Sequence, residues 1–205
     1  MPPKVKYSKE MFIHAAIEIV REKGMAAVTA RELGNKLGCS SRPVFTAFQN
    51  MEEVQHEVIL EAKKRLDSYL GIAEGFELEF KKIGMQMIKF AIEEPNLFKI
   101  VFTDEKPEPR SFEELKKDLG RFYEYSIEVC MKDYGLDKAG AERLFERLWI
   151  HSYGIGMLCA TRMCVFTEEE IAAKLGEEFY ATILLIKSGR LSEYEYTQKP
   201  IKKEN

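Results

Sequence analysis

The chain has 205 residues, which is enough for one or two domains with a buried core. With 45% hydrophobic and 32% charged residues it has the composition of a globular protein, and no apolar run approaches the roughly 20 residues that cross a bilayer. The net charge of −3 is uneven: residues 1–50 hold eight lysines and arginines against four glutamates, a net of +4, which leaves −7 for the remainder. This asymmetry indicates that one end of the chain meets a polyanion, although a solvated basic face explains the charge equally well.

The cysteines and histidines favour a cytoplasmic protein without a metal or cofactor. Four cysteines and no secretory signal predict reduced thiols. The three histidines form no metal-ligand spacing with them, so we expect no zinc site.

The N-terminal region predicts two helices joined by a short connection. The first begins after Ser8, a good N-cap, carries an apolar stripe through residues 12–20 and stops at Gly24. The second begins at Thr29, opens with a capping box and ends at Gly38. A glycine after each helix is the usual stop signal.

A third short helix is predicted up to about Phe48, with Ser40 or Ser41 as its N-cap. Pro43 then falls in the first turn, where its missing N–H has no partner within the helix to lose. The proline therefore marks where this helix begins.

The remainder also reads as helical, and no alternating strand pattern appears. A loop is predicted over residues 103–111. The expected helices cover residues 51–70, 74–94, 96–102, 112–134, 138–164 and 167–188. The fold class is therefore all-α, and the chain divides into a three-helix region at 1–50, a helical body at 51–190 and a polar tail at 191–205.

Two short helices separated by a turn with a glycine are typical of a helix-turn-helix, here over about residues 29–48. The N-terminal residues of its second helix enter the major groove, which makes Arg42 the best candidate for a bidentate contact to guanine; the alternative is that Arg42 is merely a surface charge. Phosphate contacts are expected from the start of the helix after Thr29 and from the N-terminal flank. The predicted DNA-binding residues are Lys6, Tyr7, Thr29, Arg31, Ser40, Ser41, Arg42, Phe45 and Thr46.

The order of these features, with the segment TARELGNKLGCSSRPVFTAF followed by MEEV and a long helix, resembles the tetracycline-repressor (TetR) family of bacterial transcriptional regulators. The specific resemblance covers about residues 8–60. It implies a homodimer that binds a palindromic double-stranded operator and is released by a small, largely apolar ligand. Phe45 stands at the usual tyrosine position and Met51 at the usual lysine position, so two customary phosphate contacts are missing and the salt-dependent part of binding should be weaker.

The resemblance also implies roles for the body. Large apolar residues of the body are expected to line a ligand pocket, with the polar groups of His151 and Tyr153 orienting the ligand. The alternative is that the aromatic residues among them only fill the hydrophobic core. The predicted ligand-binding residues are Met87, Phe90, Phe98, Phe102, Phe122, Trp149, His151, Tyr153 and Met157. The predicted dimer-interface residues, on the last two long helices, are Gly154, Leu158, Leu175, Phe179, Ile183 and Ile186.

Two other classes of protein compete with a DNA-binding regulator. An all-helical interaction module that has lost DNA binding would explain the changes at Phe45 and Met51. An enzyme is not expected, because the sequence has no nucleophile elbow, phosphate loop, metal cluster or dinucleotide fingerprint.

Overall fold

The structure is a computed structural model that describes residues 7–71, 80–103 and 111–189. Within these ranges the chain is helical and contains no strand, which confirms the all-α prediction. The elements are α1 (Lys9–Lys23), the 3₁₀ helix η1 (Met25–Ala27), α2 (Ala30–Leu37), α3 (Val44–Ala47), α4 (Met51–Tyr69), α5 (Phe80–Glu93), α6 (Pro95–Phe102), α7 (Phe112–Leu119), α8 (Arg121–Tyr134), α9 (Lys138–Ala160) and α10 (Glu168–Lys187).

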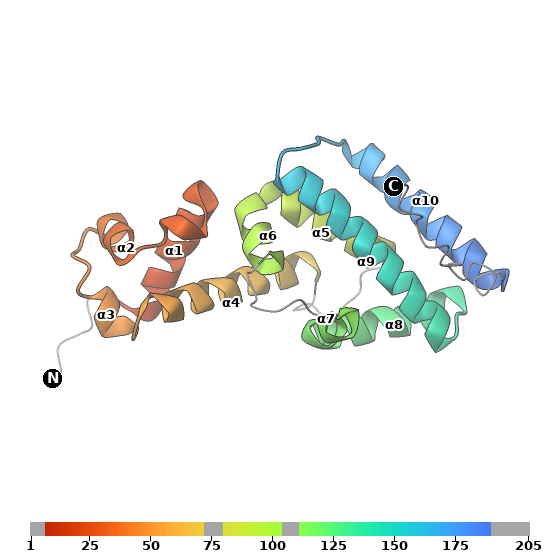
Figure 1. Cartoon of the computed structure of the whole chain (residues 1–205), viewed down its shortest axis with the longest axis horizontal. Helices are drawn as coiled ribbons and strands as arrows, with labels where there is room; N and C mark the ends of the chain where they lie inside the picture. Colours follow the sequence, from red (N-terminus) through yellow and green to blue (C-terminus); the bar gives the residue numbers. More distant parts are fainter. Residues whose placement is uncertain (1–6, 72–79, 104–110, 190–205) are drawn as a thin grey trace, which may run out of the picture.

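The helices α1, α2 and α3 gather at one end of an elongated molecule, and α4 leads from them into a bundle formed by the later helices (Figure 1). Helix α9 lies at the centre of this bundle, in contact with α5, α8 and α10. We refer to α1–α3 as the head and to α5–α10 as the body.

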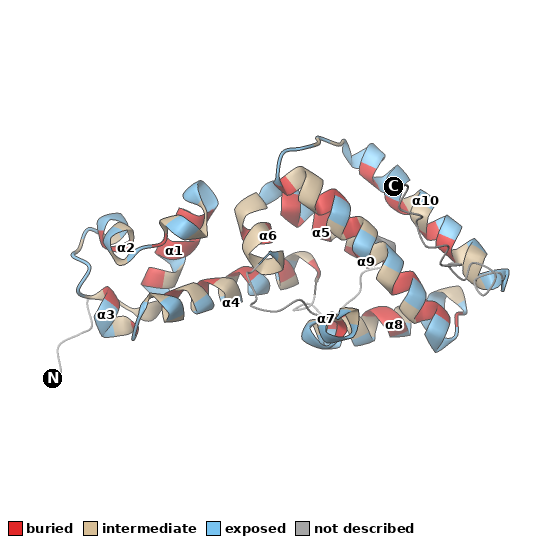
Figure 2. Ribbon diagram, in the orientation of Figure 1, coloured by how far each residue is buried: buried red, intermediate tan, exposed pale blue. Residues whose placement is uncertain are grey.

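Head and body share one continuous hydrophobic core. Helix α1 packs against both α4 and α6. Phe12 of α1, Val58 of α4 and Leu97 of α6 are each completely buried in the same cluster. Figure 2 shows buried residues on the inward faces of these three helices. The head is therefore not joined to the body by α4 alone.

The predicted helix starts at Ser8, Thr29 and Thr167 are confirmed. The Ser8 hydroxyl accepts a hydrogen bond from the Met11 backbone N–H at 3.3 Å, and the Thr29 hydroxyl accepts one from that of Glu32 at 3.2 Å. At Thr167 a complete capping box forms at the start of α10. Each cap satisfies a backbone donor that the first turn of a helix leaves unpaired.

The third helix differs from the prediction. It begins at Val44, and neither Ser40 nor Ser41 caps it; Pro43 occupies the N-cap position with φ −60° and ψ −27°. A turn precedes it, in which the Val44 N–H donates to the Ser41 carbonyl at 3.2 Å. Pro43 therefore lies before the helix and not in its first turn. Its missing N–H still costs no hydrogen bond of the helix.

Two longer predicted helices are shorter than expected. The segment 112–134 divides at Gly120, whose φ of 49° and ψ of −127° interrupt the helix between α7 and α8. The segment 138–164 ends at Ala160, and Arg162 beyond it adopts a left-handed φ of 58°. The helix predicted from residue 74 begins at Phe80 within the described residues; the residues before it lie outside them.

Candidate nucleic-acid interface and ligand cavity

The turn between α2 and α3 is held close to α2 by its backbone. Gly38 takes the left-handed conformation, with φ 67° and ψ 34°, and ends α2. The Cys39 N–H donates to the Gly34 carbonyl at 2.8 Å. A Cβ at Gly34 would lie only 2.7 Å from the Cys39 carbonyl oxygen and 3.0 Å from the backbone of Ser40, so a glycine is required where the turn crosses the helix. Sequence reasoning missed Gly34, because only the folded turn brings residues 39 and 40 against it.

The side chains predicted to face outward from α2, the turn and α3 are exposed. Phe45 is 54% exposed, whereas the apolar residues before and after it in this segment, Val44 and Phe48, are buried. The exposed set comprises Thr29, Arg31, Ser40, Ser41, Arg42, Phe45 and Thr46.

Most of the positive charge of the head is neutralised within the chain. Lys9 binds Glu53 and Glu57 at 2.8 and 2.9 Å. Lys36 binds Glu22 at 2.9 Å and Glu18 at 3.2 Å.

Two further cations of the head are also paired. Lys23 binds Glu32 at 2.5 Å, and Arg21 binds Glu94. Among residues 7–50, only Arg31 and Arg42 form no ion pair with a described residue. Both are exposed, one in the first turn of α2 and the other just before α3. The cations that remain available to a polyanion therefore lie on the surface formed by α2 and the following turn.

The N-terminal flank is described only in part. Lys6 lies outside the described residues. Tyr7 is half-buried, and its ring packs on Phe12 with the centroids 6.1 Å apart. Its ring therefore helps to cover the head core.

A polar joint fastens the end of α1 to the body. The Arg21 guanidinium donates to both carboxylate oxygens of Glu94, which stands at the start of α6, and its Nε–Oε2 distance is 2.7 Å. This hydrogen bonding raises the pKa of Arg21. The amide of Asn96 donates to the Arg21 carbonyl at 3.0 Å. A movement of α6 would therefore be transmitted to α1 through these hydrogen bonds.

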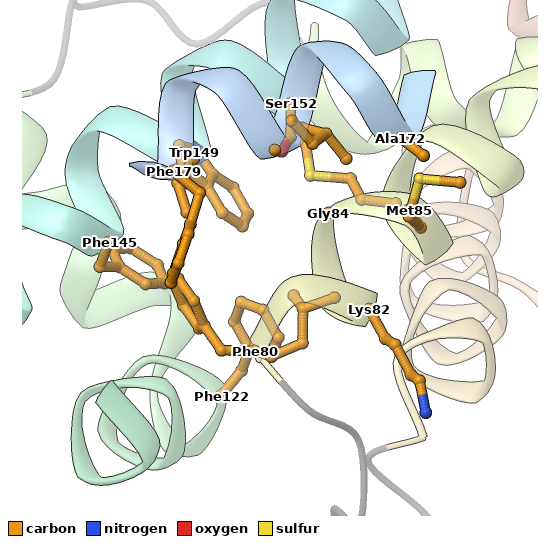
Figure 3. A pocket seen from close by; sticks show the side chains of 15 residues that line it. Phe80, Lys82, Gly84, Met85, Phe122, Phe145, Trp149, Ser152, Ala172 and Phe179 are labelled. Atoms are coloured by element: carbon orange, nitrogen blue, oxygen red, sulfur yellow. The ribbon is translucent and has the colours of Figure 1, made fainter. Parts of the chain in front are cut away.

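An apolar cavity of about 250 Å³, partly open to solvent, lies in the body between α5, α8, α9 and α10 (Figure 3). Its walls are mainly aromatic and aliphatic, and Ser152 is the polar uncharged side chain among them. Lys82 stands at the edge, and its ammonium points away from the cavity in Figure 3. The lining residues are Phe80, Lys82, Ile83, Gly84, Met85, Met87, Phe122, Phe145, Leu148, Trp149, Ser152, Ala172, Leu175, Gly176 and Phe179.

Three of the nine predicted ligand-binding residues, Met87, Phe122 and Trp149, line this cavity. Phe90 and Phe98 do not, because they are completely buried in the core.

Of the remaining four predicted residues, Phe102 lines a second cavity, which is described next. The rings of Phe102 and Tyr153 pack together at 5.9 Å, and Met157 packs beside the same core. His151 lines neither of the two cavities that we describe, and its Nε2 is buried without a hydrogen-bond partner among the described residues.

A second cavity of about 350 Å³ lies between α4, α6, α7 and α8. Phe122 and Trp149 line both cavities, so these two rings form a shared wall. Asp67 of α4 faces the second cavity, where burial raises the pKa of its carboxyl. Helix α4, which supports the head, is therefore separated from the first cavity by one aromatic layer.

The predicted dimer-interface residues divide into two groups. Leu175 and Phe179 are only 8% and 4% exposed and line the first cavity, so within one chain they are already buried. Gly154 is exposed, and the other three are half-buried: Leu158, Ile183 and Ile186.

The outward apolar residues of α9 and α10 are different ones. Ile150 lies one turn before Gly154 on α9, and Tyr180 lies one turn before Leu184 on α10. These three large side chains are 55%, 60% and 68% exposed. They could not be separated from the buried positions by periodicity alone, because both helices are apolar on more than one face.

The described part of the chain offers no cluster of three or more metal-ligating side chains. None of its helices combines the length and the apolar character that crossing a bilayer requires. Neither the models of known protein families nor the curated proteins compared with this chain gave a match.

Proposed function

We propose that the protein is a cytoplasmic, dimeric DNA-binding transcriptional regulator, a repressor that a small, largely apolar ligand releases from a palindromic operator, as its resemblance to the tetracycline-repressor family implies. The observation that carries the proposal is the distribution of charge on the head. Four of the cations between residues 7 and 50 are held by glutamates, while Arg31 and Arg42 are exposed and form no ion pair with a described residue.

The surface of α2 and the following turn has the chemistry for contact with DNA. The guanidinium of Arg42 suits a guanine edge, and the Phe45 ring suits a thymine methyl group or a sugar. The first turn of α2 presents backbone N–H groups beside Arg31, which favours a phosphate. Helix α3 is only four residues long, so the turn before it must share the base contacts.

A palindromic operator needs two heads in one particle. Ile150 on α9 and Tyr180 and Leu184 on α10 are large apolar side chains that are exposed within one chain, and α10 lies on the side of the body away from the head (Figure 1). A second copy that packs its own α9 and α10 against this surface would form a four-helix interface.

The ligand response uses the aromatic wall and the polar joint. A ligand in the first cavity displaces Trp149 or Phe122, which also line the second cavity against α4. Helix α4 and the Arg21–Glu94 contact then carry the displacement to α1. The ligand favours the body conformation that binds it better, and in that conformation the two heads no longer match the operator spacing.

The test is a gel-shift titration against DNA flanking the chain's own coding region, at two salt concentrations and without ligand. Specific binding that weakens with salt is expected. Arg42→Ala should cost about 1–3 kcal/mol on the preferred sequence and relax the base preference. Lys36→Ala is the matched control, because Glu18 and Glu22 already engage that lysine, and it should change affinity by less than about twofold.

Two outcomes would count against this assignment. No binding at low salt would overturn DNA recognition and favour an all-helical interaction module. An equal loss on all sequences for Arg42→Ala would make Arg42 a phosphate contact instead of a base contact.

A further inference from the structure

Two buried serines of the body differ in how their hydroxyls are satisfied. Ser126 of α8 donates to the Phe122 carbonyl, one turn earlier, at 2.8 Å, which is the usual arrangement for a serine inside a helix. Ser152 of α9 is 3% exposed and lines the first cavity, yet its hydroxyl forms no hydrogen bond with a described residue. The Ser152 oxygen is open to the cavity, so a polar group that enters the cavity can form a hydrogen bond with it.

Gly84 lets α5 pack closely against Ser152. A Cβ at position 84 would lie 2.8 Å from the Ser152 oxygen and 3.2 Å from Leu175 Cδ1. Any larger residue at this position would therefore push the Ser152 hydroxyl or the Leu175 side chain out of place. In Figure 3, Ser152 and Gly84 lie on facing helices at the same side of the empty space.

The cavity does not suit a buried charge. Lys82 is its charged lining residue, and it is exposed with its ammonium turned away from the interior. An ionised group inside would lose its hydration without gaining a counter-charge, which costs far more than one hydroxyl can return.

Size and wall chemistry limit the ligand further. A cavity of about 150 Å³ holds benzene, which has six non-hydrogen atoms. In the same proportion, a cavity of about 250 Å³ holds roughly ten non-hydrogen atoms. Phe145 stacks on Trp149 with centroids 5.7 Å apart, and Phe122 stands at an angle to both. A further ring extends such an arrangement favourably.

We infer that the first cavity binds a small uncharged aromatic compound of about ten non-hydrogen atoms, whose single hydroxyl or carbonyl group hydrogen-bonds to Ser152. Gly84 allows α5 to approach Ser152 closely and so helps to fix the position of that hydroxyl. This inference deepens the proposed function. Binding of the compound does not depend on that proposal; only the effect of the compound on DNA binding rests on it.

The test compares three probes of similar shape on the full chain without DNA: 4-propylphenol, propylbenzene and 4-propylbenzoate. Calorimetric titration gives the dissociation constants, and the fluorescence of Trp149, the single tryptophan of the chain, reports whether the probe sits in this cavity. We expect 4-propylphenol to bind and 4-propylbenzoate to bind at least tenfold more weakly.

Three variants separate the hydroxyl from general packing. Ser152→Ala should weaken 4-propylphenol roughly fivefold, which corresponds to a net hydrogen bond of about 1 kcal/mol, and leave propylbenzene unchanged. Gly84→Ala should weaken 4-propylphenol as well. Ser126→Ala, the matched control outside the cavity, should leave both unchanged.

The inference is overturned if none of the three probes binds, if the carboxylate binds as well as the phenol, or if Ser152→Ala weakens phenol and hydrocarbon equally. Because no DNA is present, such a result leaves the proposed DNA recognition standing. Failure of the Arg42 experiment, conversely, leaves the cavity result intact.

Discussion

Gly34 offers the sharpest test of how the turn before α3 is held. Replacing it with alanine adds one methyl group, whose carbon would lie 2.7 Å from the Cys39 carbonyl oxygen and 3.0 Å from the Ser40 carbonyl group. These are backbone atoms, and the Cys39 N–H is itself bonded to the Gly34 carbonyl at 2.8 Å. The turn must therefore move by several tenths of an ångström and stretch that hydrogen bond.

The expected cost follows from two opposing contributions. Alanine is better than glycine inside a helix by about 1 kcal/mol. Overpacking against a fixed backbone costs about 1–3 kcal/mol. Gly154→Ala isolates the first contribution, because a Cβ at that exposed helical position meets nothing within 4 Å. The free energy of unfolding should therefore be lower in Gly34→Ala than in Gly154→Ala by about 1–3 kcal/mol.

Urea denaturation followed by circular dichroism measures both variants, and a DNA titration shows whether the head surface moves. Gly34→Ala should lose DNA affinity beyond its loss of stability, because the displaced turn carries Ser41 and Arg42. If Gly34→Ala is as stable as Gly154→Ala and binds DNA normally, the close crossing of turn and helix is not what fixes this surface.

Three other predictions concern the joint, the exposed apolar surface and the buried thiol. Glu94→Gln removes the charge that holds Arg21, so amide hydrogen exchange in the last turn of α1 should speed up roughly threefold to fivefold, while exchange in α10 should not change. Unchanged exchange in α1 would show that the Arg21–Glu94 contact does not hold α1 to α6. Leu184→Glu should convert the proposed dimer to a monomer in sedimentation, whereas Lys187→Glu on the same helix should not; a dimer that survives Leu184→Glu must use another surface. Burial raises the pKa of the Cys130 thiol to about 12 from an ordinary 9.0, so native protein at pH 8 should resist alkylation at Cys130 until it unfolds. Because the pKa of Cys130 is higher in the folded state, its contribution to the free energy of unfolding is complete below pH 9.0 and is lost as the pH rises towards 12. A free energy of unfolding that rises between these two pH values would contradict the raised pKa of Cys130.

The local chemistry of the chain was enough to predict most of the helices. Ser8, Thr29 and Thr167 each cap the helix that the sequence assigns to them. The apolar stripe predicted through residues 12–20 faces the core, where Phe12, Ala16 and Val20 are completely buried. These predictions succeed because capping and apolar periodicity act within a few residues. The start of α3 was misplaced because a turn from Ser41 to Val44 competes with a helix of the same residues.

The cavity lining could not be predicted in the same way. Phe98 and Trp149 are both large aromatic residues on apolar helix faces, yet one is core and the other is cavity wall. Ser152 and Gly84 carry no local signal, since their importance lies in facing each other across two helices. Whether a side chain fills space or borders it depends on how α5, α9 and α10 pack, and that is a property of contacts between residues far apart in the sequence.

The sequence by itself therefore determined an all-helical chain, the positions of its main caps and which side of the head faces inward. The tertiary structure decided which of the head's basic residues remain unpaired. The positive charge of residues 1–50 is visible in the sequence, but Glu53, Glu57 and Glu94 come from outside that segment and reach Lys9 and Arg21 only when α4 and α6 pack against α1. Arg31 and Arg42 form no ion pair with a described residue, and none of these three glutamates reaches them.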